Sequence, residues 1–193
     1  MSSERKAPLH LRSGVEADVE AIRELYVTVA RESGGLARFA DEVTAAYVNT
    51  FVSRSMTDGI IIVAESSNGE IVGELHAYRN SLRRFSHVLG ALTVAVLPKA
   101  QGRGVGRHLF EALLAEVREH RADILRVELI VQESNVRAQR LYASLGFHAE
   151  GRLIDSIQNM QTGIAESDIP MAWLRNRAVA SRLDARFTPN QLI

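Results

Sequence analysis

The most informative residues form a short glycine-rich loop, Gln101–Gly106, between an expected strand and an expected helix. Pro98 ends the strand because proline disfavours the helical conformation in the preceding residue and cannot donate a ladder hydrogen bond. The first turn of a helix offers unpaired N–H groups and the positive end of its dipole, and glycines let an anion approach the backbone closely. The loop therefore predicts a phosphate or pyrophosphate cradle, with Gln101 and Arg103 as additional donors.

Three alternatives to a phosphate cradle can be compared with the loop. A flexible glycine turn that joins a strand to a helix accounts for the glycines alone equally well. The dinucleotide pattern Gly-x-Gly-x-x-Gly fails after Gly102 and Gly104, because Arg107 stands where the third glycine is required. The nucleoside-triphosphate pattern Gly-x-x-x-x-Gly-Lys-Ser/Thr is absent from the sequence.

A second candidate pair, Asn135 and Tyr142, lies on an expected helix over residues 135–145 that Gly146 ends. Seven residues make almost two helical turns, so the two side chains project from one face. Asn135 suits an N-cap, and Tyr142 suits a core aromatic with a hydrated hydroxyl. These structural roles are compatible with a functional role for both residues.

The elements that must position these residues follow from hydrophobic periodicity. We expect an α/β fold of the α+β type. Strands are predicted at residues 9–11, 60–64, 71–75, 88–97, 125–131 and 169–173, with a further one from residue 147, and helices at 19–29, 41–54, 105–120 and 135–145.

Composition indicates one globular domain. The chain has 193 residues, 46% hydrophobic and 24% charged, with a formal net charge of zero and no cysteine. Zero net charge gives no general attraction to nucleic acid or anionic membranes, and we expect no metal. We expect a flexible leader over residues 1–8, the domain over 9–174 and a tail over 175–193. Without an apolar signal segment or a long apolar run, a cytoplasmic location is expected.

Both motifs resemble one known family. Gln101–Gly106 matches Gln/Arg-x-x-Gly-x-Gly/Ala, the coenzyme A pyrophosphate motif of the GNAT superfamily of N-acetyltransferases, and residues 135–147 resemble its second signature, Asn-x-x-Ala-x-x-x-Tyr-x-x-x-Gly-Phe. The resemblance spans residues 9–174, and the sequence looks like bacterial amino-acid, small-amine and ribosomal-protein N-acetyltransferases. It implies a GNAT-like mixed, mostly antiparallel central sheet, flanked by helices and splayed between its central strands.

The resemblance also implies the co-substrate, acetyl-coenzyme A, and the residues that hold it. The pyrophosphate would lie on the loop, and the pantetheine arm would lie along residues 94–96 in the gap between splayed strands. Four arginines, at positions 103, 107, 137 and 140, lie near the helix starts that flank the phosphates. The residues implied to bind the co-substrate are Val94, Ala95, Val96, Gln101, Gly102, Arg103, Gly104, Val105, Gly106, Arg107, Asn135 and Tyr142.

For catalysis, the resemblance implies direct attack by an amine, with Tyr142 protonating the departing thiolate. The base is open. Some relatives carry a carboxylate at the start of the central strand, but residues 87–93 contain no Asp or Glu. Glu74 and His76 share one side of the preceding strand, and His87 is a third candidate. Solvent-facing positions would explain all three equally, and a water chain is the alternative. Tyr142 and Glu74 are the catalytic candidates.

We therefore expect an acetyl-coenzyme A-dependent N-acetyltransferase whose acceptor is a primary amine, with a small amine or amino acid favoured. Acetylation of a protein N-terminus or lysine is an alternative, and a non-catalytic coenzyme A-binding module is another. No nucleic acid or membrane partner is expected, and a homodimer is expected by analogy. The acceptor pocket would form from the first two helices and the segments 79–84 and 155–166.

Overall fold

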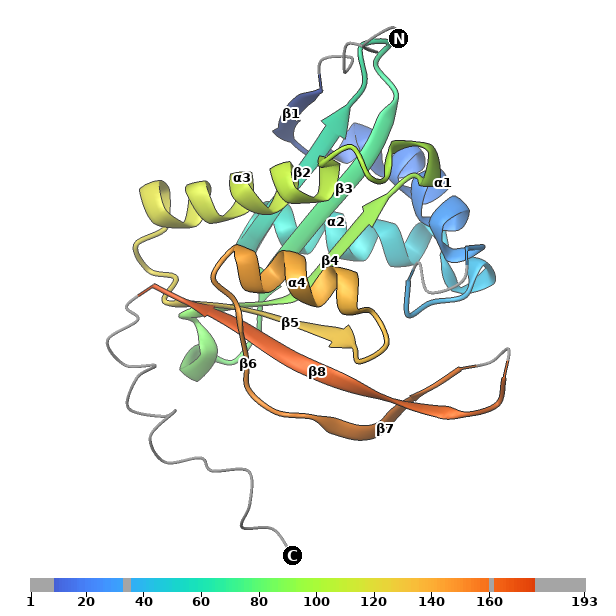
Figure 1. The fold of residues 1–193 in the computed structure, drawn as a ribbon. Helices are drawn as coiled ribbons and strands as arrows, with labels where there is room; N and C mark the ends of the chain where they lie inside the picture. Colours follow the sequence, from blue (N-terminus) through green and yellow to red (C-terminus); the bar gives the residue numbers. More distant parts are fainter. Residues whose placement is uncertain (1–8, 33–35, 160–161, 176–193) are drawn as a thin grey trace, which may run out of the picture.

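A computed structural model describes residues 9–32, 36–159 and 162–175. The predicted leader, and the predicted tail after residue 175, lie outside the described residues. The described part forms an eight-stranded sheet in the order β1-β2-β3-β4-β5-β8-β6, with β7 paired to β8 (Figure 1). The strands are β1 (His10–Ser13), β2 (Gly59–Glu65), β3 (Ile71–Arg79), β4 (Val88–Val96), β5 (Arg126–Gln132), β6 (His148–Ala149), β7 (Leu153–Gln158) and β8 (Ala165–Leu174).

Helices cover both faces of the sheet. Helices α1 (Val19–Ala30) and α2 (Ala45–Asp58) lie on one face, and α3 (Val105–His120) and α4 (Val136–Ser144) lie on the other (Figure 1). Short 3-10 turns are found at Glu16–Asp18, Ala40–Glu42, Arg83–Phe85 and Pro98–Ala100. All pairings are antiparallel except that of β4 with β5, so the sheet is mixed and mostly antiparallel, as the sequence predicted.

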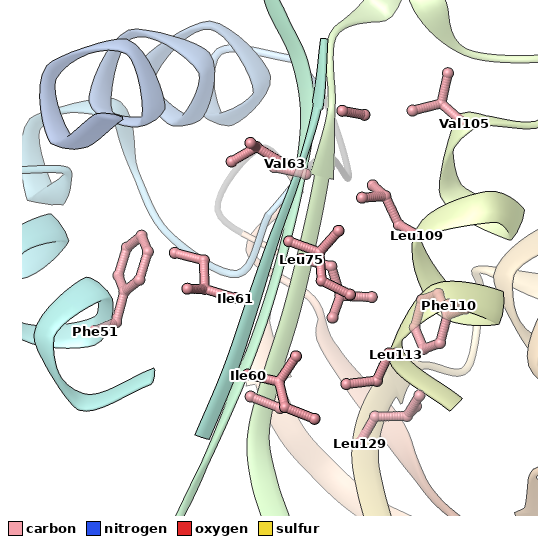
Figure 2. Close-up of a cluster of buried hydrophobic side chains, with 14 of the residues drawn as sticks. Phe51, Ile60, Ile61, Val63, Leu75, Val105, Leu109, Phe110, Leu113 and Leu129 are labelled. Atoms are coloured by element: carbon pink, nitrogen blue, oxygen red, sulfur yellow. The ribbon is translucent and has the colours of Figure 1, made fainter. Parts of the chain in front are cut away.

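Strand β3 is buried on both faces. Leu75 packs toward Leu109 of α3, whereas Ile61 of the neighbouring β2 points toward Phe51 of α2 (Figure 2). Ile61 pairs with His76, and residues directly opposite in an antiparallel ladder share a face. His76 therefore lies on the α1/α2 face of the sheet, under the helices, and so does Glu74, two residues earlier on the same strand.

The sheet parts in its middle. β4 and β5 pair in parallel only at Val88 with Arg126 and Leu89 with Val127. Beyond Gly90, the β3–β4 register shifts by one residue, and Ala91 has φ +48. A bulge of this kind bends its strand and increases the local twist. The bend at Ala91 explains why β4 leaves β5, and it confirms the predicted splay between the central strands.

Several elements differ from the sequence prediction. Helix α2 begins at Ala45, after the N-cap Thr44, rather than near residue 41. The pattern also missed β7, whose side chains are mostly exposed and so lack an alternation of apolar residues. Arg175, predicted to open the tail, donates hydrogen bonds to the carbonyls of Ile124 and Val117 and so belongs to the fold. No helix in the described part of the chain is long and apolar enough to cross a membrane.

Candidate active site

The glycine loop ends in a left-handed residue at the start of α3. Gly102 has φ +75 and Gly104, the N-cap of α3, has φ +88, a region that side chains with a Cβ rarely adopt. Within the described residues, no backbone carbonyl accepts a hydrogen bond from the amides of residues 102–107. Several N–H groups at the positive end of a sixteen-residue helix are therefore free to bind an anion.

Side chains around the loop have distinct roles. Gln101 donates from Nε2 to the Val96 carbonyl at 3.1 Å, which ties the loop to the end of β4. Arg107 donates to Ser144 of α4 at 2.8 Å. The Arg137 guanidinium lies 3.9 Å from the position that a Cβ on Gly102 would occupy, so it is the arginine of α4 placed beside the cradle. The side chain of Arg103 is exposed.

The open edge of β4 offers main-chain groups to the gap. Leu97 donates to the Val72 carbonyl at 2.9 Å, and hydrogen-bonded pairs alternate along an antiparallel ladder. Ala95 therefore directs its main-chain groups toward β3, while Val94 and Val96 direct theirs toward the gap. Ala95 was predicted to bind the co-substrate, but its backbone faces β3 and its side chain is buried among the core residues.

A cavity of about 790 Å³ runs through the gap between β4 and β5. Tyr142 of α4 and Asn135, the N-cap of α4, line it from one face of the sheet, and Tyr26 and His76 line it from the other. Val94 lies between them on β4. The cavity therefore joins the two faces of the sheet at the point where the strands part.

Tyr142 is a buried aromatic whose hydroxyl is available. Its ring packs on Phe110 at 4.9 Å between centroids and on Phe147 at 6.1 Å, which fixes its position. Burial raises the pKa of Tyr142 to about 12, so the phenol keeps its proton at neutral pH. Among the described residues, no group accepts that proton, and the side chain lines the cavity.

The structure also brings Glu74 and His76 together with Tyr26 of α1. The Tyr26 hydroxyl lies 2.6 Å from Glu74 Oε2, and His76 Nδ1 lies 3.1 Å from Glu74 Oε1. Glu74 is 0% exposed and His76 is 2% exposed, so the solvent-facing explanation is wrong for both. Glu74 lies behind the other two and does not line the cavity, and the exposed His87 is also absent from its lining.

Comparison with known proteins agrees with this geometry. The model of the acetyltransferase (GNAT) family matches residues 19–147. The chain belongs to the GNAT acetyltransferase family. It is accordingly an acetyltransferase that uses acetyl-coenzyme A.

Solved GNAT structures share the fold across most of this chain. An acetyltransferase of the GNAT family from Streptococcus pneumoniae has a TM-score of 0.77 at 22% identity, covering 86% of this chain and 99% of the other. A ribosomal-protein-alanine N-acetyltransferase from Brucella melitensis has a TM-score of 0.74 at 24% identity, with the same two coverages. A putative acetyltransferase from Salmonella typhimurium, solved with its cofactor acetyl-CoA, has a TM-score of 0.70 at 23% identity, covering 88% and 95%.

The residues of the GNAT site in this chain have the chemical groups that acetyl-coenzyme A requires. The loop at residues 102–107 presents unpaired amides for the pyrophosphate, and the open edge of β4 presents Val94 and Val96 to an extended amide-bearing arm. The side chain of Val105, another predicted binding residue, is buried against Gly73, so only its amide faces the loop. The cavity lies next along the gap and ends beside Tyr142.

Sequence reasoning missed several residues of the GNAT site. Tyr26, Arg38 and Tyr47 were not singled out as site residues, yet all three line the cavity. Glu128 of β5 was also missed, although its carboxylate lies 3.1 Å from the position of a Cβ on Gly90. A carboxylate thus reaches the start of β4 from the neighbouring strand, which no local pattern in residues 87–93 could reveal.

Asn135 has a measurable structural role in this GNAT domain. Its Oδ1 accepts a hydrogen bond from the Ala138 amide at 3.1 Å, which confirms the predicted N-cap. We expect Asn135→Ala to lower the free energy of unfolding by about 1 kcal/mol. Asn135→Ser, which keeps a capping oxygen, should stay close to wild type. Urea denaturation of the three proteins measures the difference, and equal stability of the alanine variant would contradict the cap.

Proposed function

We propose that this protein transfers the acetyl group of acetyl-coenzyme A to the primary amine of a small molecule, by direct attack and without a covalent enzyme intermediate. An amino acid is the favoured acceptor. The observation that carries the proposal is the cavity that joins the two faces of the sheet, with Tyr142 on one side and Tyr26 and His76 on the other. A nucleophile and a leaving group can thus occupy opposite sides of one reacting carbon.

Each part of the site has a task in this reaction. When bound, acetyl-coenzyme A supplies an activated acetyl group and a thiolate leaving group. The unpaired amides at residues 102–107 and the main chain of Val94 and Val96 bind and orient it. The Val94 amide, directed into the gap, is placed to donate to a carbonyl oxygen as negative charge develops there. Tyr142 donates a hydrogen bond to the sulfur as it departs.

The acceptor side of the cavity carries a cation suited to a carboxylate. Arg38 lines the cavity, and its guanidinium carbon lies 3.9 Å from the centre of the Tyr47 ring. No carboxylate of the described residues forms an ion pair with Arg38. A guanidinium held in place by stacking and lacking an anionic partner favours an acceptor that carries both an amine and a carboxylate.

A second acceptor class, the N-terminus of a peptide, is favoured by a neighbouring cavity. This cavity of about 420 Å³ shares Tyr78, Ala91 and Glu128 with the first, so the two adjoin. Residues of the segment after β3, including Asn80 and Ser81, line it. An extended acceptor could place its amine in the first cavity and its following residues in the second.

The test is an acceptor panel that measures free coenzyme A with a thiol reagent. The chain has no cysteine, so the enzyme itself contributes no signal. We expect free amino acids to release coenzyme A faster than the matching amines that lack the carboxylate. Tripeptides that turn over faster than free amino acids would instead support the peptide acceptor. Calorimetry that shows no binding of acetyl-coenzyme A would contradict the whole proposal.

A further inference from the structure

Glu74 is a buried carboxylate that forms no ion pair with an arginine of the described residues, so its burial needs an explanation. Glu74 is 0% exposed, and its hydrogen-bond partners among the described side chains are Tyr26 and His76. Burying a carboxylate is costly unless donors satisfy it. Burial also raises the pKa of Tyr26, and the charge of Glu74 adds to that effect, so the Tyr26 phenol is a proton donor throughout the neutral range.

Counting donors fixes the tautomer of His76. Tyr26 has one proton, and with Glu74 ionised the 2.6 Å contact assigns that proton to the hydrogen bond with Glu74 Oε2. His76 Nδ1 then has only acceptors around it, namely the Glu74 oxygens at 3.1 and 3.3 Å and the Tyr26 oxygen at 3.2 Å. Nδ1 must therefore carry a proton, and in a neutral imidazole the lone pair is left on Nε2.

The Nε2 atom is open to the cavity. It forms no hydrogen bond with the part of the chain that the structure describes, and it is not among the buried polar atoms that lack a partner. His76 lines the cavity. The ring is held by stacking on Phe51 at 3.9 Å with an interplanar angle of 11°, so its orientation is fixed.

We propose that His76 removes the proton from the acceptor amine through Nε2, and that Glu74 is a positioning residue that fixes the imidazole tautomer. The inference rests on the proposed function of the same cavity and adds the proton acceptor to it. The sequence analysis favoured Glu74 as the catalytic residue. The structure instead places His76 at the cavity, and Glu74 lies behind it and does not line the cavity.

The protons balance in this scheme. Nε2 takes one proton from the ammonium, and the freed lone pair forms the N–C bond as the C–S bond breaks. The nitrogen loses a second proton as the amide forms, and this proton balances the one that converts the thiolate to a thiol. The proton on His76 returns to solvent through the cavity. While it is held, His76 and Glu74 form an ion pair, so the arriving charge neutralises a buried negative charge.

Other titratable groups surround His76 and the cavity. Tyr78 stacks on His76 from the same strand at 6.0 Å, and Tyr47 contacts Phe51 on α2. Glu128 also lines the cavity and could compete for the role of base, but Arg126 donates to it at 2.8 Å and holds it in an ion pair. The remaining charged residues that line the cavity are Arg38, Glu42 and Asp168.

The first test reads the tautomer in the free protein, without substrate. Nitrogen NMR of histidine-labelled protein distinguishes a protonated from an unprotonated ring nitrogen, and His76→Gln assigns the signals among the six histidines. We expect the neutral His76 ring to carry its proton on Nδ1 and to leave Nε2 unprotonated, and we expect Glu74→Gln to disturb this tautomer. A neutral ring protonated at Nε2 overturns the proposal.

The second test is the dependence of the rate on pH. For His76→Gln we expect kcat/KM near pH 7 to fall by about 10²-fold, since general-base catalysis contributes about 10² to 10⁴. With an α-amino acceptor, the loss should shrink as pH rises past about 8, because the amine then arrives without its extra proton. A purely structural defect would persist at every pH. The control His87→Gln removes an exposed imidazole outside the cavity and should match wild type.

Two results separate this inference from the proposed function. Wild-type protein that acetylates an amine while His76→Gln keeps the wild-type pH profile contradicts the inference alone. The same holds if Glu128→Gln, and not His76→Gln, produces the loss of kcat/KM that shrinks as pH rises. Wild-type protein that releases no coenzyme A with any amine contradicts the proposed function, and the NMR measurement still decides the tautomer. Calorimetric affinity for acetyl-coenzyme A confirms that each variant is folded.

Discussion

Tyr142→Phe is expected to lower kcat about a hundredfold while leaving the affinity for acetyl-coenzyme A nearly unchanged. The ring keeps its packing on Phe110 and Phe147, so only the hydroxyl is lost. General-acid help contributes about 10² to 10⁴. The pKa of Tyr142, raised to about 12, lies well above the value of about 8.5 for an ordinary thiol. Complete transfer of the proton from Tyr142 to the thiolate is therefore uphill. We expect Tyr142 to donate a hydrogen bond instead, and its contribution to the rate to lie near 10², the low end of the range.

The same pKa gives a pH prediction with a definite sign. A phenol whose pKa is raised remains protonated below that value and loses its proton above it. The contribution of Tyr142 should therefore stay constant from neutral pH to about 10 and decline only near 12, where the phenol ionises. Steady-state rates across this range, with calorimetric Kd values at neutral pH, test both statements. Equal kcat for wild type and Tyr142→Phe would exclude Tyr142 as the acid.

Gly104→Ala is expected to weaken acetyl-coenzyme A binding by about tenfold to a hundredfold. Gly104 has φ +88, and the left-handed conformation costs a residue with a Cβ about 1–2 kcal/mol. The added Cβ would meet His108 at 3.6 Å, an ordinary contact, so the strain falls on the backbone that aims the loop amides. A displaced amide also loses a charge-assisted hydrogen bond, and each 1.4 kcal/mol is a factor of ten in Kd. Isothermal calorimetry measures the change.

Two alanine variants serve as controls for Gly104→Ala. Gly69 has φ +81 in the β2–β3 turn, and a Cβ added there would meet nothing within 4 Å, so Gly69→Ala carries the same strain away from the loop. It should lower stability and leave Kd unchanged. Gly106 is helical, and an added Cβ would lie 3.9 Å from Val96, so Gly106→Ala should keep or raise stability. A Kd for Gly104→Ala within twofold of wild type would contradict the cradle.

Local patterns predicted those parts of the molecule whose causes are local. The helix α3, its glycine loop and the strand that ends before Pro98 all follow from residues adjacent in the sequence, and the structure has them within a residue or two. The N-cap at Asn135 was equally readable, because the capping oxygen and the amide that it accepts from are three residues apart. The family then followed from two such local signatures in the correct order.

The arrangement of residues on the acceptor side of the cavity could not be predicted, because it depends on contacts between segments that are distant in the sequence. Tyr26 and Glu74 are far apart in the sequence, and only the packing of α1 on β3 shows that Glu74 is buried and bonded. The alternation of polar residues in β3 suggested an exposed face, which is correct only when no helix covers it. The bulge at Ala91 has no sequence signal, since alanine does not favour a positive φ.

The interruption between β4 and β5 has a consequence for selectivity. A sheet normally offers bare main-chain groups only along its outermost strands, where they invite strands from other molecules. Here the two bare rims lie inside the protein, beyond Leu89 and Val127, and helices flank them on both faces. A slender chain with amide groups can complete the ladder on the β4 side. The unpaired main chain of β4, which would favour aggregation at an outer edge of the sheet, here favours ligands with an extended, amide-bearing chain.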